Sequence, residues 1–107
     1  MRVTLADALA RLPGPAGEGY ASMIDYGTLT VEIYAPRGVD PQKPHTRDEV
    51  YVVMSGTGSF VNGPDRHEFG PGDVLFVPAN VPHRFEDFTH DLTLWAIFCS
   101  PQNENPR

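Results

Sequence analysis

Apolar and polar residues alternate with a period of two along much of this chain, a pattern that is typical of β-strands. The clearest example is residues 28–35, in which the apolar positions are Leu29, Val31 and Ile33. Further strands are predicted over residues 20–26, 49–54, 59–61, 66–69, 74–77, 82–88 and 92–99. The run 74–77 is continuously apolar, so we expect it to be buried on both faces.

Turn residues separate these segments at short intervals. The chain has 11 prolines and 10 glycines without a low-complexity run, as expected for many short strands joined by tight turns. Asn62-Gly63 is the strongest hairpin signal. Eight short strands in a small all-β domain must close on themselves or form two layers to protect their edges.

One helix is predicted, over residues 4–12. Thr4 can cap its start, and Asp7 lies at the third helical position, where a negative charge stabilises the helix. Leu5, Leu9 and Leu12 follow at helical spacing and form an apolar stripe. We expect this short helix to cover an end or a side of the sheet.

Length and charge limit the functional classes. With 107 residues the chain is expected to be a single domain, with a helix and loop over residues 1–17 and a frayed polar tail over 100–107. A net charge of −6 argues against nucleic acid as a partner. Apolar runs are too short to cross a membrane, and Asp7 and Arg11 interrupt any signal-peptide pattern. The single cysteine, Cys99, fits a reducing compartment, so we expect a cytoplasmic protein.

Two stretches carry side chains suited to chemistry. His45 and Glu49 lie four residues apart at the mouth of the strand 49–54, so in an extended chain both point to the same face. Val50, Val52 and Met54 alternate on the opposite face. The second stretch, residues 72–87, contains a buried strand and a turn, after which His83 opens another strand. If the two stretches lie side by side, two imidazoles and one carboxylate meet.

These stretches resemble the two motifs of the cupin superfamily. In the first motif the matching residues are Gly38, His45, Glu49 and Gly56, and Lys43 stands where the first histidine belongs. In the second they are Gly72, Pro78 and His83, with Asn80 in place of a glycine and Asp87 in place of an asparagine. Asn80 can adopt the left-handed conformation that a turn glycine would supply. The resemblance implies a double-stranded β-helix, or jelly-roll, barrel with a metal site inside, and a homodimer.

Two histidines and one carboxylate suffice to hold a metal ion. His45, Glu49 and His83 form the ligand set used by non-haem Fe(II) oxygenases, so a divalent transition metal is expected, with Fe or Mn favoured and Zn or Ni also suitable. Each histidine should donate its other ring nitrogen to an acceptor, and Asp87 is a candidate for His83. A metal-free, hydrogen-bonded polar cluster of the same three residues is the alternative.

Lys43 allows three interpretations. It can point to solvent from the loop, hold an anionic group of a substrate as an ammonium, or act as a fourth ligand when burial beside a cation makes it neutral. Arg47 shares the inward parity, and we expect it to be exposed or paired with Asp48 or Asp87.

Aromatic residues supply a possible pocket wall. Tyr51, Phe85 and Trp95 share the parity of the predicted ligands or lie on the last apolar strand, where they can line a small-molecule pocket or belong to the core. Tyr51 is also a candidate for a catalytic acid or base.

Two functions remain open. The first is a metal-dependent enzyme that acts on a small oxygen-bearing molecule by dioxygenation, isomerisation or decarboxylation. The second is a non-catalytic cup that binds a small molecule, with or without metal. In either case we expect a small-molecule ligand, no nucleic acid or membrane partner, and a homodimer in which Val50, Val52 and Met54 are covered.

Overall fold

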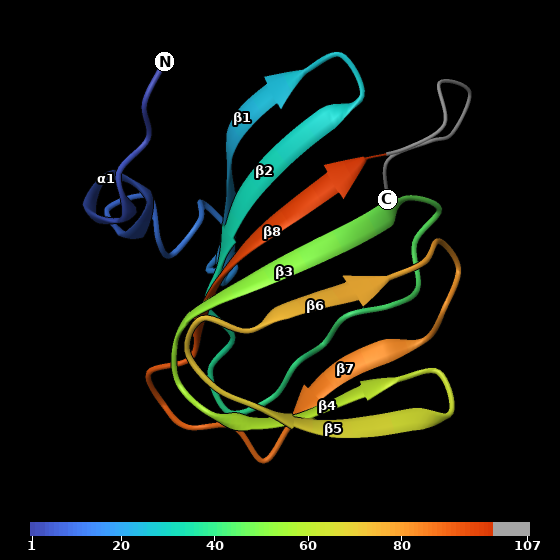
Figure 1. Cartoon of the computed structure of the whole chain (residues 1–107). Helices are drawn as coiled ribbons and strands as arrows, with labels where there is room; N and C mark the ends of the chain where they lie inside the picture. The colour runs from blue at the N-terminus through green and yellow to red at the C-terminus, as the bar shows by residue number, and fades with distance from the viewer. Residues whose placement is uncertain (100–107) are drawn as a thin grey trace.

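The computed structural model describes residues 1–99, and the predicted polar tail over 100–107 lies outside them (Figure 1). One short helix, α1 (Leu5–Leu9), precedes eight strands. The strands are β1 (Tyr20–Tyr26), β2 (Leu29–Tyr34), β3 (Asp48–Ser55), β4 (Gly58–Asn62), β5 (Asp65–Phe69), β6 (Val74–Val77), β7 (His83–Glu86) and β8 (Thr93–Cys99). All eight predicted strands are therefore present, with small shifts at their ends.

The strands form two antiparallel sheets that face each other as two layers of a jelly-roll barrel (Figure 1). The larger sheet has the order β1-β2-β8-β3-β6, and the smaller sheet has the order β5-β4-β7. The chain crosses from the larger to the smaller sheet between β3 and β4 and again between β6 and β7. Strands of the two sheets therefore alternate along the sequence. The predicted all-β jelly roll with a short N-terminal helix is thus confirmed.

Cross-strand register decides which side chains face the interior. Tyr51 of β3 lies opposite Ala96 of β8, and Ala96 lies opposite Glu32 of β2. Directly opposed residues share a face of the sheet. The Tyr51 ring lies 5.0 Å from the Phe85 ring of the smaller sheet, between ring centroids, so this face is the inner one.

The outer face of the larger sheet is apolar. Val50, Val52 and Met54 point outward, as predicted, because they alternate with the inward Tyr51 and Val53. Their outward neighbours on β6 and β8 are Val74, Phe76, Trp95 and Ile97, and Val31 of β2 extends the same face beside Ile97. The polar register of β2 faces inward, and there Glu32 and Tyr34 are each only 8% exposed.

Two predictions about burial are wrong. β6 is an edge strand, so its outer side chains are open, and Val74 and Phe76 are 65% and 55% exposed. In α1 Thr4 caps the helix as predicted, and the side chain of Asp7 accepts from the Thr4 backbone amide, which completes a capping box. The helix ends earlier than predicted, however, and its buried residue is Ala8, whereas Leu9 is 40% exposed.

Left-handed turns close the connections where the sequence predicts them. Asn80 has φ +66°, so it does replace a turn glycine. The hairpin between β4 and β5 turns at Gly63, with Asn62 paired to Asp65. Among the described residues, no helix has the length and apolarity needed to cross a membrane.

Candidate metal centre

Both sheets contribute to the centre of the barrel. Glu49 lies on β3 of the larger sheet, where it faces Phe98 of β8 and Val77 of β6. His83 begins β7 of the smaller sheet, and His45 lies in the loop that leads into β3. The backbone carbonyl of His45 accepts a 2.7 Å hydrogen bond from the amide of Asn80, which ties the two motif stretches together.

The structure brings the three predicted side chains together in a buried position. His45 Nε2 lies 2.9 Å from Glu49 Oε1, and His83 Nε2 lies 3.3 Å from the same oxygen. Glu49 is 1% exposed, His83 4% and His45 8%. Ligand atoms of all three lie within 4.8 Å of one another, close enough to share one ion. The geometric prediction therefore holds.

Each imidazole is oriented by a backbone carbonyl. His83 Nδ1 lies 2.9 Å from the carbonyl oxygen of Val81, and His45 Nδ1 lies 3.4 Å from that of Arg47. A carbonyl only accepts, so Nδ1 carries the proton in each ring. Both Nε2 lone pairs are then directed toward the centre, as metal-binding histidines require.

The acid–base properties of the cluster follow from its burial. Burial alone raises the pKa of Glu49, but the close approach and charge of His45 and His83 outweigh it and leave this pKa below its usual value. Burial lowers the pKa of His83, but Glu49, the Val81 carbonyl and the charge of Asp40 outweigh it, so this pKa is raised. The centre thus holds a carboxylate and attracts positive charge.

Unsatisfied polar atoms indicate that a cation fits here. His45 Nε2 and both carboxylate oxygens of Glu49 are buried, and within the described residues they make no hydrogen bond of suitable direction, despite the 2.9 Å approach. Buried polar atoms without partners are costly. Two imidazole nitrogens and a carboxylate are a ligand set for divalent transition metals, so the residues present fit a metal ion.

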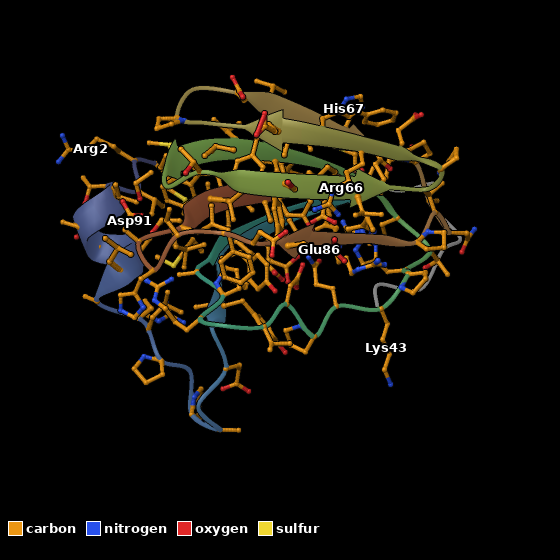
Figure 2. The ribbon with its side chains drawn as sticks, turned by 90° about the horizontal axis from the view of Figure 1, so that it is seen from below. Arg2, Lys43, Arg66, His67, Glu86 and Asp91 are labelled. Atoms are coloured by element: carbon orange, nitrogen blue, oxygen red, sulfur yellow. The ribbon has the colours of Figure 1, made fainter. Side chains whose placement is uncertain are left out.

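Gln42, rather than Lys43, reaches this centre. Lys43 is exposed and points away from the body of the molecule (Figure 2), which agrees with its solvent-facing interpretation. The side chain of the preceding Gln42 turns inward, and its Oε1 lies 3.3 Å from His83 Nε2. The same oxygen accepts a 2.6 Å hydrogen bond from the hydroxyl of Tyr51.

Asp40 holds this loop segment in place. Its carboxylate accepts hydrogen bonds from the side-chain amide of Gln42 at 2.9 Å and from the backbone amide of Phe85 at 2.8 Å. The hydroxyl of Tyr34 also donates to it. The loop before β3 is therefore fixed to both β2 and β7.

Two predictions about neighbouring polar residues are wrong. Asp87 does not support His83, because its side chain is 82% exposed and accepts a 3.1 Å contact from Arg66. Its backbone has φ +51°, which turns it out of the strand. Arg47 is 6% exposed, and its guanidinium donates to the Thr30 hydroxyl and to the backbone carbonyls of residues 28 and 98 rather than to Asp48 or Asp87.

The three predicted pocket residues separate. Tyr51 and Phe85 are buried beside the cluster, with the Tyr51 ring 6.1 Å from that of His83 between centroids. Trp95 lies opposite Val52 and Ile33 on the outer face, so its prediction as a pocket residue is wrong. Because β8 is apolar on both faces, periodicity does not predict which of its side chains face inward. The register of β8 with β2 and β3 decides the direction of Trp95.

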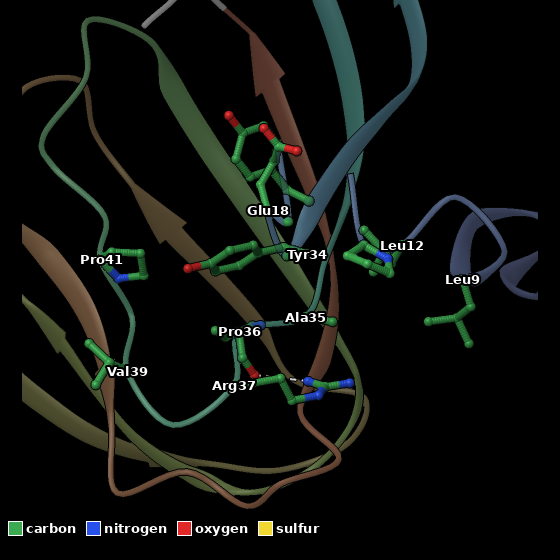
Figure 3. A pocket seen from close by; sticks show the side chains of 13 residues that line it. Leu9, Leu12, Glu18, Tyr34, Ala35, Pro36, Arg37, Val39 and Pro41 are labelled. Carbon is green, nitrogen blue, oxygen red and sulfur yellow. Dashed lines mark hydrogen bonds between the residues drawn. The ribbon is translucent and has the colours of Figure 1, made fainter. Parts of the chain in front are cut away.

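Two hollows lead from the surface toward Glu49. The inner one, of about 190 Å³, is lined by Tyr20, Glu32, Tyr34, Pro41, Gln42, Glu49 and Ala96. The outer one, of about 590 Å³, is more apolar and extends past Leu9, Leu12 and Val39 (Figure 3). Tyr20, Tyr34 and Pro41 line both hollows, and Figure 3 shows the Tyr34 ring reaching between Leu12 and Pro41.

Glu32, Asp40 and Gln42 were not identified from the sequence. Glu32 occupies the polar register of β2, which is usually the solvent side of a half-buried strand. Asp40 and Gln42 lie in a proline-rich loop, where parity does not predict direction. The available signal for Asp40 and Gln42 was that amide and carboxylate side chains occur in the loop next to the first motif.

The family model described as a cupin domain (Cupin_2) matches residues 30–95. A protein of Streptomyces coelicolor without an assigned function is 34% identical over 86 residues, which cover 78% of this chain and 82% of that protein. Among solved structures, a Cupin 2 conserved barrel domain protein from Salinispora arenicola superposes with a TM-score of 0.71 at 18% identity, covering 94% of this chain and 89% of that one. A candidate mannose-6-phosphate isomerase from Ralstonia eutropha has a TM-score of 0.64 at 24% identity, covering 82% and 89%.

Proposed function

Because this chain belongs to the cupin domain family, whose members commonly bind metals, we propose that it holds a divalent transition metal and acts on a small oxygen-bearing molecule. His45, Glu49 and His83 are the proposed ligands. The observation that carries the proposal is the convergence of these three buried side chains, in which His45 Nε2 and both carboxylate oxygens of Glu49 have no directional partner among the described residues. Iron or manganese is favoured, and zinc or nickel would also suit the ligand set.

When bound, such a metal supplies Lewis-acid polarisation of a substrate oxygen or activation of dioxygen. The chain supplies the remaining requirements. The inner hollow of about 190 Å³ adjoins Glu49 and limits the reacting group to a few heavy atoms. Phe98 and Tyr51 line the buried side of the cluster, which keeps bulk water away from it.

Charge also restricts the substrate. Glu32 and Glu49 line the inner hollow together with two tyrosines and Gln42, whereas no lysine or arginine lines it within residues 1–99. A neutral, hydroxyl- or carbonyl-bearing group is therefore favoured there over a free anion.

Elemental analysis of protein purified without an affinity tag tests the proposal. We expect about one transition metal per chain, and its loss in a His83→Ala variant that remains folded. Exposed His67 provides a matched control, since His67→Ala should keep the metal. Oxygen consumption with small catechols, thiols and keto acids then tests dioxygenase chemistry. Metal-free protein from several growth media would contradict the proposal.

A non-catalytic cup that binds a small molecule is the second candidate. Burial, followed by the negative charges of Glu49 and Asp40, raises the pKa of Tyr51 well above its ordinary value. The phenol therefore stays protonated and cannot serve as a base near neutral pH. A ligand that raises the melting temperature without being converted would support this candidate.

We also propose that the outer face of the larger sheet pairs with the same face of a second copy. Val74 and Phe76 are largely exposed there, beside the apolar side chains of β3 and β8. Contiguous exposed apolar surface commonly marks an interface. A two-fold axis through this face would bury it against itself, which is the commonest symmetry of homo-oligomers.

A further inference from the structure

We propose that Gln42 supplies a fourth protein ligand through its side-chain oxygen, in place of the histidine that the cupin motif puts at position 43. This inference rests on the proposed metal centre and specifies its donor set as two nitrogens and two oxygens. It also explains how a chain with Lys43 at the motif position can complete the centre, since the neighbouring residue reaches in from the same loop.

The orientation of the amide is fixed by its neighbours. The nitrogen of the Gln42 side chain donates to Asp40 at 2.9 Å, and a carboxylate can only accept. The opposite end, Oε1, must therefore face the cluster. The hydroxyl of Tyr51 donates to this oxygen at 2.6 Å and leaves its second lone pair free to point at the centre.

The spacing between donor atoms suits one coordination shell. Bonds of about 2.0–2.2 Å at tetrahedral or octahedral angles separate neighbouring donors by about 3.0–3.5 Å. Gln42 Oε1 lies 3.3 Å from His83 Nε2, and His83 Nε2 lies 3.3 Å from Glu49 Oε1. Gln42 and Glu49 also line the same inner hollow. The amide oxygen of Gln42 is therefore spaced from His83 Nε2 as a further ligand of the same ion would be.

A second observation supports a ligand role over a purely structural one. Asp40 also accepts from the backbone amide of Phe85 on β7 and from the Tyr34 hydroxyl on β2. The amide of Gln42 is therefore held from two strands, so little side-chain entropy is lost on coordination. An amide oxygen is a harder donor than imidazole, so the centre should prefer manganese or iron over copper more than a three-histidine centre does.

Titration with Mn²⁺ alone, followed by the electron paramagnetic resonance signal of the free ion, tests the inference without substrate. Gln42→Met keeps the length of the side chain and removes the hard donor. We expect its dissociation constant for Mn²⁺ to rise about 100-fold, at or above the loss typical for an outer-shell partner. The matched control Lys43→Met should stay within about twofold of the wild type.

A second variant covers the case in which Gln42→Met does not fold. Gln42→His restores the donor of the family motif, and we expect the visible spectrum of its Co²⁺ complex to differ from that of the wild type. Wild-type affinity in folded Gln42→Met, or an unchanged Co²⁺ spectrum in Gln42→His, would overturn the role of Gln42 alone. Failure of the wild type to bind any of these ions would instead overturn the metal centre itself.

Discussion

Replacing Glu49 by Gln should abolish stabilisation by metal while it preserves the shape of the site. Glu49 is the acidic residue among the three proposed ligands and is 1% exposed, so solvent screens its negative charge little. An amide of the same size cannot offer a charged oxygen to a cation. In the metal-free state its NH₂ group can donate to an imidazole Nε2, so the fold should persist.

The size of the effect follows from linkage. An ion at 100 times its dissociation constant stabilises the native state by about 2.7 kcal/mol. A domain of this length has an unfolding entropy of roughly 0.2 kcal/mol/K near its midpoint, so the melting temperature should rise by about 12 °C. In Glu49→Gln the same concentration should raise it by less than about 2 °C.

Differential scanning calorimetry with and without Mn²⁺ measures both shifts. Glu68→Gln is the control. Glu68 is exposed on β5, so this substitution removes the same charge outside the cluster. The control should keep the full wild-type shift. An equal shift in folded Glu49→Gln and in the wild type would refute the assignment, because the stabilising ion would then bind elsewhere.

Three further predictions follow from other parts of the fold. Gly56 has φ +94°, and an added Cβ would lie 2.6 Å from the Cα of Leu92, so Gly56→Ala should destabilise the protein by about 3 kcal/mol in urea unfolding; a loss below about 1 kcal/mol would contradict this. Phe76→Asp should convert the proposed dimer to monomers in sedimentation at tens of micromolar protein, whereas a wild type that is already monomeric there would remove the interface. In metal-free protein the raised pKa of His83 stabilises the fold below the ordinary value of 6.5, and this contribution is lost as the pH rises through the raised pKa. The lowered pKa of Glu49 stabilises it above 4.5, and this is lost as the pH falls through the lowered pKa. The free energy of unfolding should therefore be greatest between these values, and a maximum near pH 8 would contradict the charge state of the cluster.

Strand periodicity and turn residues were sufficient to predict the sheet framework, whereas the meeting of His83 with His45 and Glu49 was implied by the resemblance to the two cupin motifs. The alternation around Glu49 and Tyr51 is set by backbone geometry, so it predicts which side chains share a face. Asn80 was predicted correctly because the left-handed turn has a local steric cause.

The errors arise where long-range arrangement decides. Val74 and Phe76 are exposed because β6 is at an edge of its sheet, which a local apolar run does not reveal. Trp95 faces outward because of its register with β3. Gln42 lies in a loop without periodic geometry, and its direction is set by hydrogen bonds to Asp40, a contact that depends on the folded path of the chain.

Anomalous X-ray diffraction from crystals grown with Mn²⁺ tests the central claim most directly. We expect one anomalous peak per chain, at about 2.0–2.3 Å from His45 Nε2, His83 Nε2 and a carboxylate oxygen of Glu49. A peak that lies outside this cluster, or crystals saturated with the ion that show none between these side chains, would contradict the claim.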